Sequence, residues 1–189
     1  MVFELYTPRR MCKEPTQSKY IKVEESPIHG TGVFARINIP KGKKVIEYIG
    51  EKISKKESEK RSVQLIEKNQ DSLTDGAVYI FELNKKHDID GNVPENTARF
   101  INHSCKPNCE PEIIKNQIWL RSTKKIKKGE ELSYNYGFDL ESYEDHICRC
   151  GTKNCVGFIT SEENWPKLKK LIAKKNKKDK KAKKNQRTD

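Results

Sequence analysis

The chain has 189 residues, which suffice for one domain with appendages but not for two ordinary domains. Hydrophobic residues make up 33% of it and can build one core, whereas 35% charged residues indicate that a good part of the chain is solvated. The net charge of +12 is uneven, because residues 166–189 hold eleven lysines and one arginine against two aspartates and carry +10 of it. The preceding body is nearly neutral, so the basicity belongs to the C-terminal segment.

The sequence lacks the features of a membrane protein or a secreted protein. No run of about 20 apolar residues occurs, and residues 1–20 lack the apolar stretch of a secretory signal. We therefore expect a soluble intracellular protein that makes no membrane contact. In a reducing compartment, its six cysteines are expected to bind metal or to remain thiols rather than to form disulfides.

The hydrophobic pattern predicts a β-rich domain with few helices. Residues 1–19 show no periodicity and predict an irregular arm. Lys115 and Asn116 are expected to form the turn of a hairpin. Glycine and proline turns separate the predicted short strands, which lie at residues 20–23, 33–35, 44–48, 78–81, 110–114, 117–121 and 131–136.

Two helices are predicted. Ser54 and Glu57 have the S-x-x-E spacing of a capping box, which favours a helix over residues 54–69. Beyond about Lys174 the lysine run predicts disorder. Before it, a second helix is predicted from Ser161 onward, with an apolar face made of Trp165, Leu168, Leu171 and Ile172.

Three cysteines near the C-terminus have the spacing of a metal knuckle. Cys148, Cys150 and Cys155 form a C-x-C-x4-C pattern with a glycine that lets the backbone curl around an ion. A tetrahedral zinc site needs a fourth ligand, and spacing alone leaves Cys12, Cys105 and Cys109 open for that role. The alternative is a set of reduced surface thiols or one adventitious disulfide.

Two longer motifs identify a family resemblance. Residues 99–108 (RFINHSCKPN) and 129–136 (GEELSYNY) are similar to the two signature motifs of SET-domain protein lysine methyltransferases. Residues 29–35, 47–51 and 79–81 match shorter segments of that family in the same order. The resemblance spans about residues 20–158 and implies a SET fold of several small sheets with a knot-like C-terminal crossing.

The resemblance also implies a domain division and a ligand set. We expect an irregular arm at 1–19, a SET domain at 20–140, a post-SET zinc knuckle at 144–160, and a short helix with a lysine-rich disordered tail at 161–189. In the post-SET knuckle of this family, the signature cysteine supplies the fourth zinc ligand. The implied Zn²⁺ ligands are therefore Cys105, Cys148, Cys150 and Cys155.

The implied reaction is methyl transfer from S-adenosyl-L-methionine to a lysine amine. Such an in-line displacement needs alignment of the two reactants and exclusion of water. The lysine must arrive neutral, which favours an apolar aromatic channel, and Tyr48, Tyr134 and Tyr136 are suited to line it. By resemblance Tyr136 is the catalytic tyrosine, although alone it would read as a half-buried sheet residue. Tyr134 occupies a position where the family varies between Phe and Tyr, and a Tyr there favours mono- or dimethylation.

The resemblance places a cofactor pocket around the first motif. Asn102 and His103 are expected to bond the adenine and the amino-acid moiety, while Arg99 and Phe100 hold the pocket together. Gly30 and Gly32 allow the backbone to approach the methionine end of the cofactor, although a G-x-G run is as often only a turn. The remaining expected cofactor contacts are Val33, Phe34, Tyr79, Tyr136 and Phe158.

The chain departs from the family at two places. The arm before Tyr20 holds only Cys12, so the nine-cysteine pre-SET cluster of one histone-methylating branch is absent. Residues 92–96 stand where many members have a shorter link. Cys12 and Cys109 receive no metal role and are expected to be free thiols.

The expected function is a lysine methyltransferase that acts on a histone or another basic chromatin protein. One alternative is a non-catalytic SET module that binds chromatin. Another is a nucleic-acid-binding protein with a zinc knuckle, but that interpretation leaves both signature motifs unexplained. Residues 174–184 could contact the phosphates of DNA or a nucleosome, or could serve as a solubilising tail, a localisation signal or an automethylation substrate. The expected location is the nucleus or chromosome in a eukaryote or a eukaryotic host, and otherwise the cytoplasm.

Overall fold

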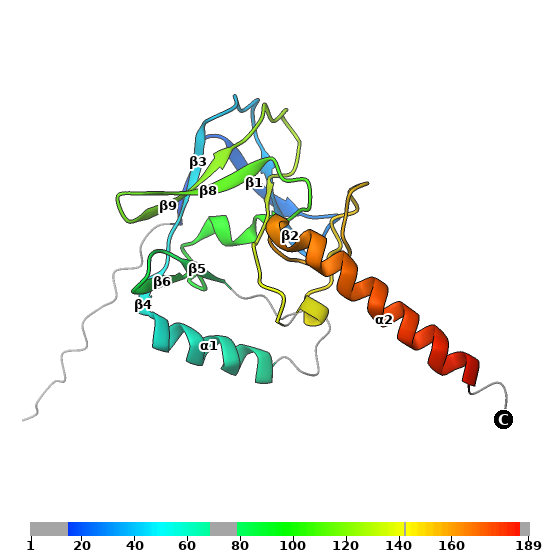
Figure 1. Cartoon of the computed structure of the whole chain (residues 1–189). Coiled ribbons are helices and arrows are strands. Elements are labelled where there is room, and N and C mark those ends of the chain that lie inside the picture. The colour runs from blue at the N-terminus through cyan, green and yellow to red at the C-terminus, as the bar shows by residue number, and fades with distance from the viewer. Residues whose placement is uncertain (1–14, 69–78, 142, 186–189) are drawn as a thin grey trace, which may run out of the picture.

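The computed structural model describes residues 15–68, 79–141 and 143–185. Within these ranges the chain forms ten short strands, two α-helices and three short 3₁₀ helices. The strands build four small sheets of two or three strands each (Figure 1). The predicted β-rich class with few helices is confirmed, and the knot-like crossing stays a prediction.

The sheets join segments that are distant in sequence. One three-stranded antiparallel sheet has the order β3 (Lys44–Tyr48), β9 (Gln117–Ser122), β8 (Cys109–Ile114). The other has the order β4 (Glu51–Ser54), β6 (His87–Asp90), β5 (Ile80–Glu82). The two-stranded sheets are an antiparallel hairpin of β1 (Ile21–Glu25) with β2 (Thr31–Ala35) and a parallel pair of β7 (Asn102–His103) with β10 (Ser133–Tyr134).

The β8–β9 hairpin forms as the sequence predicts. Lys115 and Asn116 connect its strands with φ angles of 50° and 60°. Two consecutive left-handed residues make a turn whose twist matches that of the flanking strands. Asn tolerates this conformation well, so the turn defines the register in which Ile114 pairs with Gln117.

Three strands were not predicted from the sequence, namely β4, β6 and β7. In addition, β10 is shorter than the predicted strand at 131–136, because Glu131 makes only an isolated bridge to Phe34. The reason is clear for β4 and β6, because half of the residues of each strand are charged and neither shows an apolar alternation. Ion pairs to the helix that lies between them in the sequence stabilise them instead. Asp88 of β6 lies 2.7 Å from Lys55, and Asp90 of β6 and Glu51 of β4 lie 2.6 and 2.8 Å from Arg61. Such pairs form only after distant segments meet.

The predicted first helix is confirmed as α1 (Lys55–Lys68). The hydroxyl of Ser54 accepts a hydrogen bond from the backbone N–H of Glu57 at 3.2 Å, which is one half of a capping box. Arg61 then bonds Glu57 on its own helix and Glu51 on β4. The helix therefore lies along the β4–β6–β5 sheet (Figure 1).

The second helix, α2 (Trp165–Asn185), corrects one prediction. It follows a 3₁₀ helix at Glu162–Asn164 and buries Leu168 completely, while Leu171 is 42% exposed. For the described residues the expected disorder beyond Lys174 is wrong, because the helix continues to Asn185 and projects from the body (Figure 1). Lysine and alanine are good helix formers, and a helix nucleated on the body propagates at little cost.

One hydrophobic core lies beneath the sheets and reaches the tyrosines of the second motif. Its fully buried residues come from β2, β9 and the turns that connect the small sheets, among them Val33, Ile39, Leu120, Ile126 and Leu132. No helix in the described ranges is long and apolar enough to cross a membrane.

The described end of the N-terminal arm is bonded to the body. The Thr16 hydroxyl donates to the carbonyl of Glu95 at 3.0 Å and accepts from the N–H of Thr97 at 3.0 Å. The remainder of the arm, including Cys12, lies outside the described residues. The domain boundaries proposed from the sequence stay predictions.

Candidate active site and metal centre

The two signature motifs lie side by side. In the parallel pairing of β7 with β10, Asn102 stands opposite Ser133. The side chain of Asn108 stabilises this pairing. Its nitrogen donates to the carbonyl of Glu131 at 2.7 Å, and its oxygen accepts from the N–H of Ser133 at 2.9 Å. Buried polar groups that are satisfied in this way specify a single arrangement.

Five aromatic rings form a continuous group, the aromatic cluster, beside this strand pair. Tyr134 lies 4.9 Å from Tyr136 between ring centroids, and Tyr136 lies 5.8 Å from Phe138. Phe81 lies 5.9 Å from Tyr134 and 5.3 Å from Tyr48. The three tyrosines that the sequence predicts for the lysine channel are therefore brought together, with two phenylalanines between and beside them.

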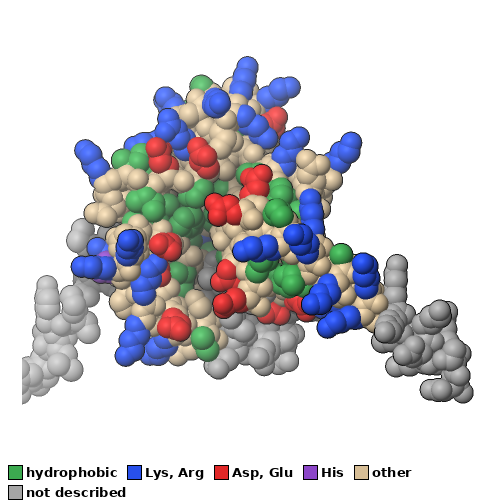
Figure 2. Space-filling view, viewed as in Figure 1, with side chains coloured by type: hydrophobic (Ala, Val, Ile, Leu, Met, Phe, Trp, Pro, Cys, Tyr) green, Lys and Arg blue, Asp and Glu red, His purple; other side chains and the backbone are tan. Residues whose placement is uncertain are grey.

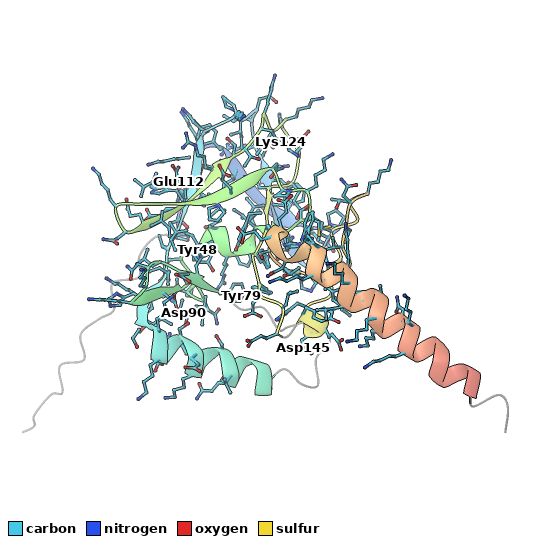
Figure 3. All side chains as sticks on the ribbon, in the orientation of Figure 1. Tyr48, Tyr79, Asp90, Glu112, Lys124 and Asp145 are labelled. Atoms are coloured by element: carbon cyan, nitrogen blue, oxygen red, sulfur yellow. The ribbon has the colours of Figure 1, made fainter. Side chains whose placement is uncertain are left out.

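Two hydroxyls of the aromatic cluster bond to backbone carbonyls. The Tyr136 hydroxyl donates to Ile101 at 3.0 Å, and the Tyr48 hydroxyl donates to Tyr79 at 2.8 Å near the centre of the molecule (Figure 3). Burial raises the pKa of Tyr48, Tyr134 and Tyr136 above the usual tyrosine value. These hydroxyls stay protonated near neutral pH, so they serve as hydrogen-bonding groups and not as bases.

Asn102 bonds to the loop between β1 and β2. Its side-chain nitrogen lies 2.8 Å from a carboxylate oxygen of Glu131, 3.1 Å from the hydroxyl of Ser26, and 3.3 and 3.2 Å from the carbonyls of His29 and Thr31. An amide nitrogen has only two hydrogens, so four acceptors exceed what it can satisfy. Some of these oxygen atoms therefore remain available to another donor. The loop between β1 and β2, called the acceptor-rich loop below, suits a ligand that carries an ammonium group, as the amino-acid end of S-adenosyl-L-methionine does.

The glycines of this loop serve different purposes. A Cβ at Gly32 would lie 2.6 Å from the Glu131 carboxylate, so only glycine allows this close packing. Gly30 has a φ of 47° and faces open space. Val33 is fully buried in the core and Phe34 is half-buried beside Glu131, so the Val33 side chain faces away from any ligand on the loop.

The other expected cofactor residues lie in two places. The guanidinium of Arg99 lies 4.8 Å from the ring centroid of Phe100 and 6.0 Å from that of Tyr79. Its Nε atom is buried without a hydrogen-bond partner among the described groups, which suits a ligand with an acceptor. Phe158 lies in the knuckle, edge-on to Tyr143 at 5.0 Å, and its contact with a cofactor stays a prediction.

His103 is held by protein groups on both sides of its ring. Its Nδ1 accepts a hydrogen bond from the backbone N–H of Tyr136 at 3.2 Å, and its Nε2 lies 3.6 Å from the sulfur of Cys105. Burial lowers the pKa of His103 to about 4, so the imidazole is neutral. A cofactor contact through the His103 side chain stays a prediction.

The four predicted metal ligands converge. The sulfur atoms of Cys105, Cys148, Cys150 and Cys155 all lie within 4.8 Å of one another. Cys105 lies 3.7 Å from Cys148 and 3.9 Å from Cys155. Zn–S bonds of about 2.3 Å in a tetrahedron place the sulfur atoms about 3.8 Å apart, so this group fits Zn²⁺. Cys109 is buried in β8, outside the group.

The thiols of this group differ in acidity. Burial raises the pKa of Cys105 to about 11 and that of Cys148 further. Burial would also raise the pKa of Cys150, but hydrogen bonds from Thr152 help to lower it to about 6. Four thiolates at these distances would repel one another, so a cation is needed before all four ionise.

One face of the molecule carries a hollow with apolar side chains in it and acidic side chains around it, while lysines and arginines gather at the periphery and over α2 (Figure 2). Exposed acids follow the aromatic cluster in sequence, among them Asp139 and Asp145. Burial lowers the pKa of His146, and Asp145 and Asp139 lie close enough to oppose part of this shift. The His146 ring lies 4.6 Å from the ring of Phe138. Acidic groups therefore lie next to the aromatic cluster.

Sequence reasoning missed three contributors to the site. Phe81 and Phe138 stand two residues after Tyr79 and Tyr136, and the alternation of a strand could have placed them on the same side. Glu131 lies in the second signature motif, but its contacts with Ser26 and Asn102 span many residues and could not be read from that motif.

Residues 30–137 match the family model described as SET domain. The chain is 38% identical over 148 residues to "Histone-lysine N-methyltransferase set-2" of Caenorhabditis elegans and 38% identical over 152 residues to "Histone-lysine N-methyltransferase trr" of Drosophila melanogaster. It is 37% identical over 149 residues to "Histone-lysine N-methyltransferase, H3 lysine-4 specific" of Chaetomium globosum.

These matches cover 76%, 78% and 76% of this chain but only 9%, 6% and 13% of the three relatives, so the chain spans a small part of their length. The family model covers more than half of the chain and includes both signature motifs. The aromatic cluster, apart from Phe138, and the small sheets, apart from β1, lie within the matched residues, whereas the acceptor-rich loop lies at their N-terminal edge. The chain belongs to the SET-domain family.

Proposed function

We propose that this chain is an S-adenosyl-L-methionine-dependent protein lysine N-methyltransferase. The observation that carries the proposal is the arrangement around β7. The Asn102 side chain bonds the acceptor-rich loop, while Ile101 and His103 bond Tyr136. Asn102 and His103 are neighbours in β7, and neighbouring side chains of a strand face opposite sides. A cofactor bound at the acceptor-rich loop and an amine bound in the aromatic cluster would therefore approach each other from opposite sides. That geometry suits an in-line displacement.

The aromatic cluster supports transfer to a lysine. A free lysine has a pKa of about 10.4 and must lose its proton before it attacks. Apolar walls disfavour the ammonium form. The Tyr136 hydroxyl donates its hydrogen to Ile101, so its oxygen can accept a hydrogen bond from the amine N–H and orient the amine. The cofactor supplies an activated methyl group on sulfur, and the protein aligns the amine with it and excludes water.

A basic substrate is the second part of the proposal. Acidic side chains surround the hollow in Figure 2, and charges of opposite sign attract a lysine-rich chain and speed its encounter with the site. The relatives are named as histone-lysine methyltransferases, and one is named for lysine 4 of H3. We infer a histone or a similarly basic chromatin protein as the substrate, in the nucleus of a eukaryotic cell or host.

Incubation with isotope-labelled S-adenosyl-L-methionine and core histones tests this function. We expect label on a histone, and mass spectrometry should identify mono- or dimethyl-lysine. Tyr134→Phe should shift the products toward a higher methylation state, because it removes a hydroxyl that narrows the channel. Cofactor binding in calorimetry without label transfer would favour the non-catalytic module, and absence of both binding and transfer would sink the enzyme proposal.

We propose contact with nucleic acid as an accessory role of α2. Residues 174–184 carry eight lysines against one aspartate, and lysines neutralise backbone phosphates without regard to sequence. In fluorescence polarisation with a DNA duplex, we expect binding that weakens steeply with salt and that is lost in a chain ending at Ala173. Equal binding by the shortened chain would contradict this role.

A further inference from the structure

The imidazole of His103 lies between the backbone of Tyr136 and the four-cysteine group, with 4% of the residue exposed. The N–H of Tyr136 donates to Nδ1 at 3.2 Å, so Nδ1 must be the unprotonated nitrogen. A neutral imidazole then carries its hydrogen on Nε2. Nε2 lies 3.6 Å from the sulfur of Cys105, a distance that suits an N–H···S hydrogen bond to a thiolate.

Tyr136 is held at both ends by the same short segment. Its hydroxyl donates to the carbonyl of Ile101, and its backbone N–H donates to His103 two residues later. Its ring lies edge-on to the imidazole, 5.4 Å between centroids at an interplanar angle of 69°. Cys105 ends the same segment, so a displacement of its sulfur would move the imidazole and, through it, the backbone of Tyr136.

We propose that His103 is a positioning residue that couples the four-cysteine group to Tyr136. Through Nε2–H it orients and stabilises the Cys105 thiolate, and through Nδ1 it holds the backbone that carries the catalytic hydroxyl. The catalytic part of this inference rests on the proposed function, whereas the two hydrogen bonds do not. Hydrogen bonds to a metal ligand are worth about 10- to 100-fold in metal affinity in other sites.

Two substitutions separate the two hydrogen bonds. In His103→Asn the side-chain oxygen takes the place of Nδ1 and keeps the acceptor for Tyr136, but the side chain no longer reaches Cys105. In His103→Gln the amide nitrogen takes the place of Nε2 and keeps the donor to sulfur, but the acceptor is lost. Each variant thus serves as the matched control of the other.

We expect opposite defects in the two variants. His103→Asn should release zinc to a chelator about 10-fold faster than the unaltered protein, and its kcat should fall less than that of His103→Gln because the acceptor for Tyr136 is kept. His103→Gln should retain zinc normally but lower kcat about 10-fold or more, because a small displacement of a reacting group is costly. The Kd of S-adenosyl-L-methionine should change by less than about 3-fold in both.

Different results would overturn the coupling. A weakened cofactor affinity in both variants, with zinc release unchanged, would make the His103 side chain a cofactor ligand. Nitrogen-15 NMR of the unaltered protein provides a test that needs no variant, because a proton on Nδ1 instead of Nε2 contradicts the inferred hydrogen bonds. If the unaltered protein transfers no methyl group, the proposed function fails, while zinc release and the NMR result still decide the contacts of His103.

Discussion

Tyr136→Phe is expected to lower kcat by about 10²- to 10³-fold, the usual effect of removing one hydrogen-bonding group that acts in the transition state. The Kd of the cofactor should change little, because phenylalanine keeps the ring that contacts Tyr134, Phe138 and His103. The hydroxyl lost is the one that bonds the carbonyl of Ile101. The measurement is single-turnover transfer to a histone peptide, with cofactor binding followed by calorimetry.

The matched control is Tyr20→Phe, which removes the hydroxyl of a tyrosine that is not one of the clustered rings and should leave kcat unchanged. A Tyr136→Phe variant that turns over at the normal rate would remove this residue from the catalytic role. A variant with normal kcat but a raised KM for the peptide would instead assign the Tyr136 hydroxyl to substrate binding alone.

Cys105→Ala is expected to abolish stoichiometric zinc binding and methyl transfer together. A structural zinc site contributes roughly 10 to 16 kcal/mol of apparent binding free energy, and three remaining thiolates cannot complete the tetrahedron. Cys105 also lies two residues after His103, so its loss disturbs the segment that holds Tyr136. Zinc content by mass spectrometry of the metal and label transfer to histones are the two measurements.

Cys109→Ala is the matched control, because Cys109 is another buried thiol but lies outside the four-cysteine group. It should keep zinc and activity, at the cost of a small cavity in the core. Stripping zinc from the unaltered protein with a chelator should reproduce the Cys105→Ala defect. Full activity in the zinc-free protein would show that the knuckle and the aromatic cluster are independent.

Several features of this protein could be predicted because their signals are local. The capping box of Ser54 and Glu57, the left-handed turn at Lys115 and Asn116, and the C-x-C-x4-C spacing each depend on residues within one short segment. Helix starts, hairpin turns and chelating loops are governed by nearby residues, so a sequence pattern is sufficient to predict them.

Other features depend on contacts between distant segments and had no local signal. β4 and β6 are too polar to be predicted as strands, and their pairing relies on Arg61 and Lys55 from helix α1, which lies between them in the sequence. Helix α2 continues through the lysine run because its first turn is anchored by Leu168. In each case a tertiary contact outweighs the local preference, as propensities of a few tenths of a kcal/mol per residue allow.

The sequence by itself determined the chemical parts of the site: the tyrosines, the asparagine and histidine of the first motif, and three clustered thiols. Only the tertiary structure decided how they act on one another. It placed Cys105 with the distant cysteines, surrounded Asn102 with acceptors from the β1–β2 loop, and turned the His103 ring toward Tyr136 and Cys105. Side-chain direction and hydrogen-bond partners depend on segments that meet only in the folded chain, so a linear motif can name these residues but cannot assign their partners.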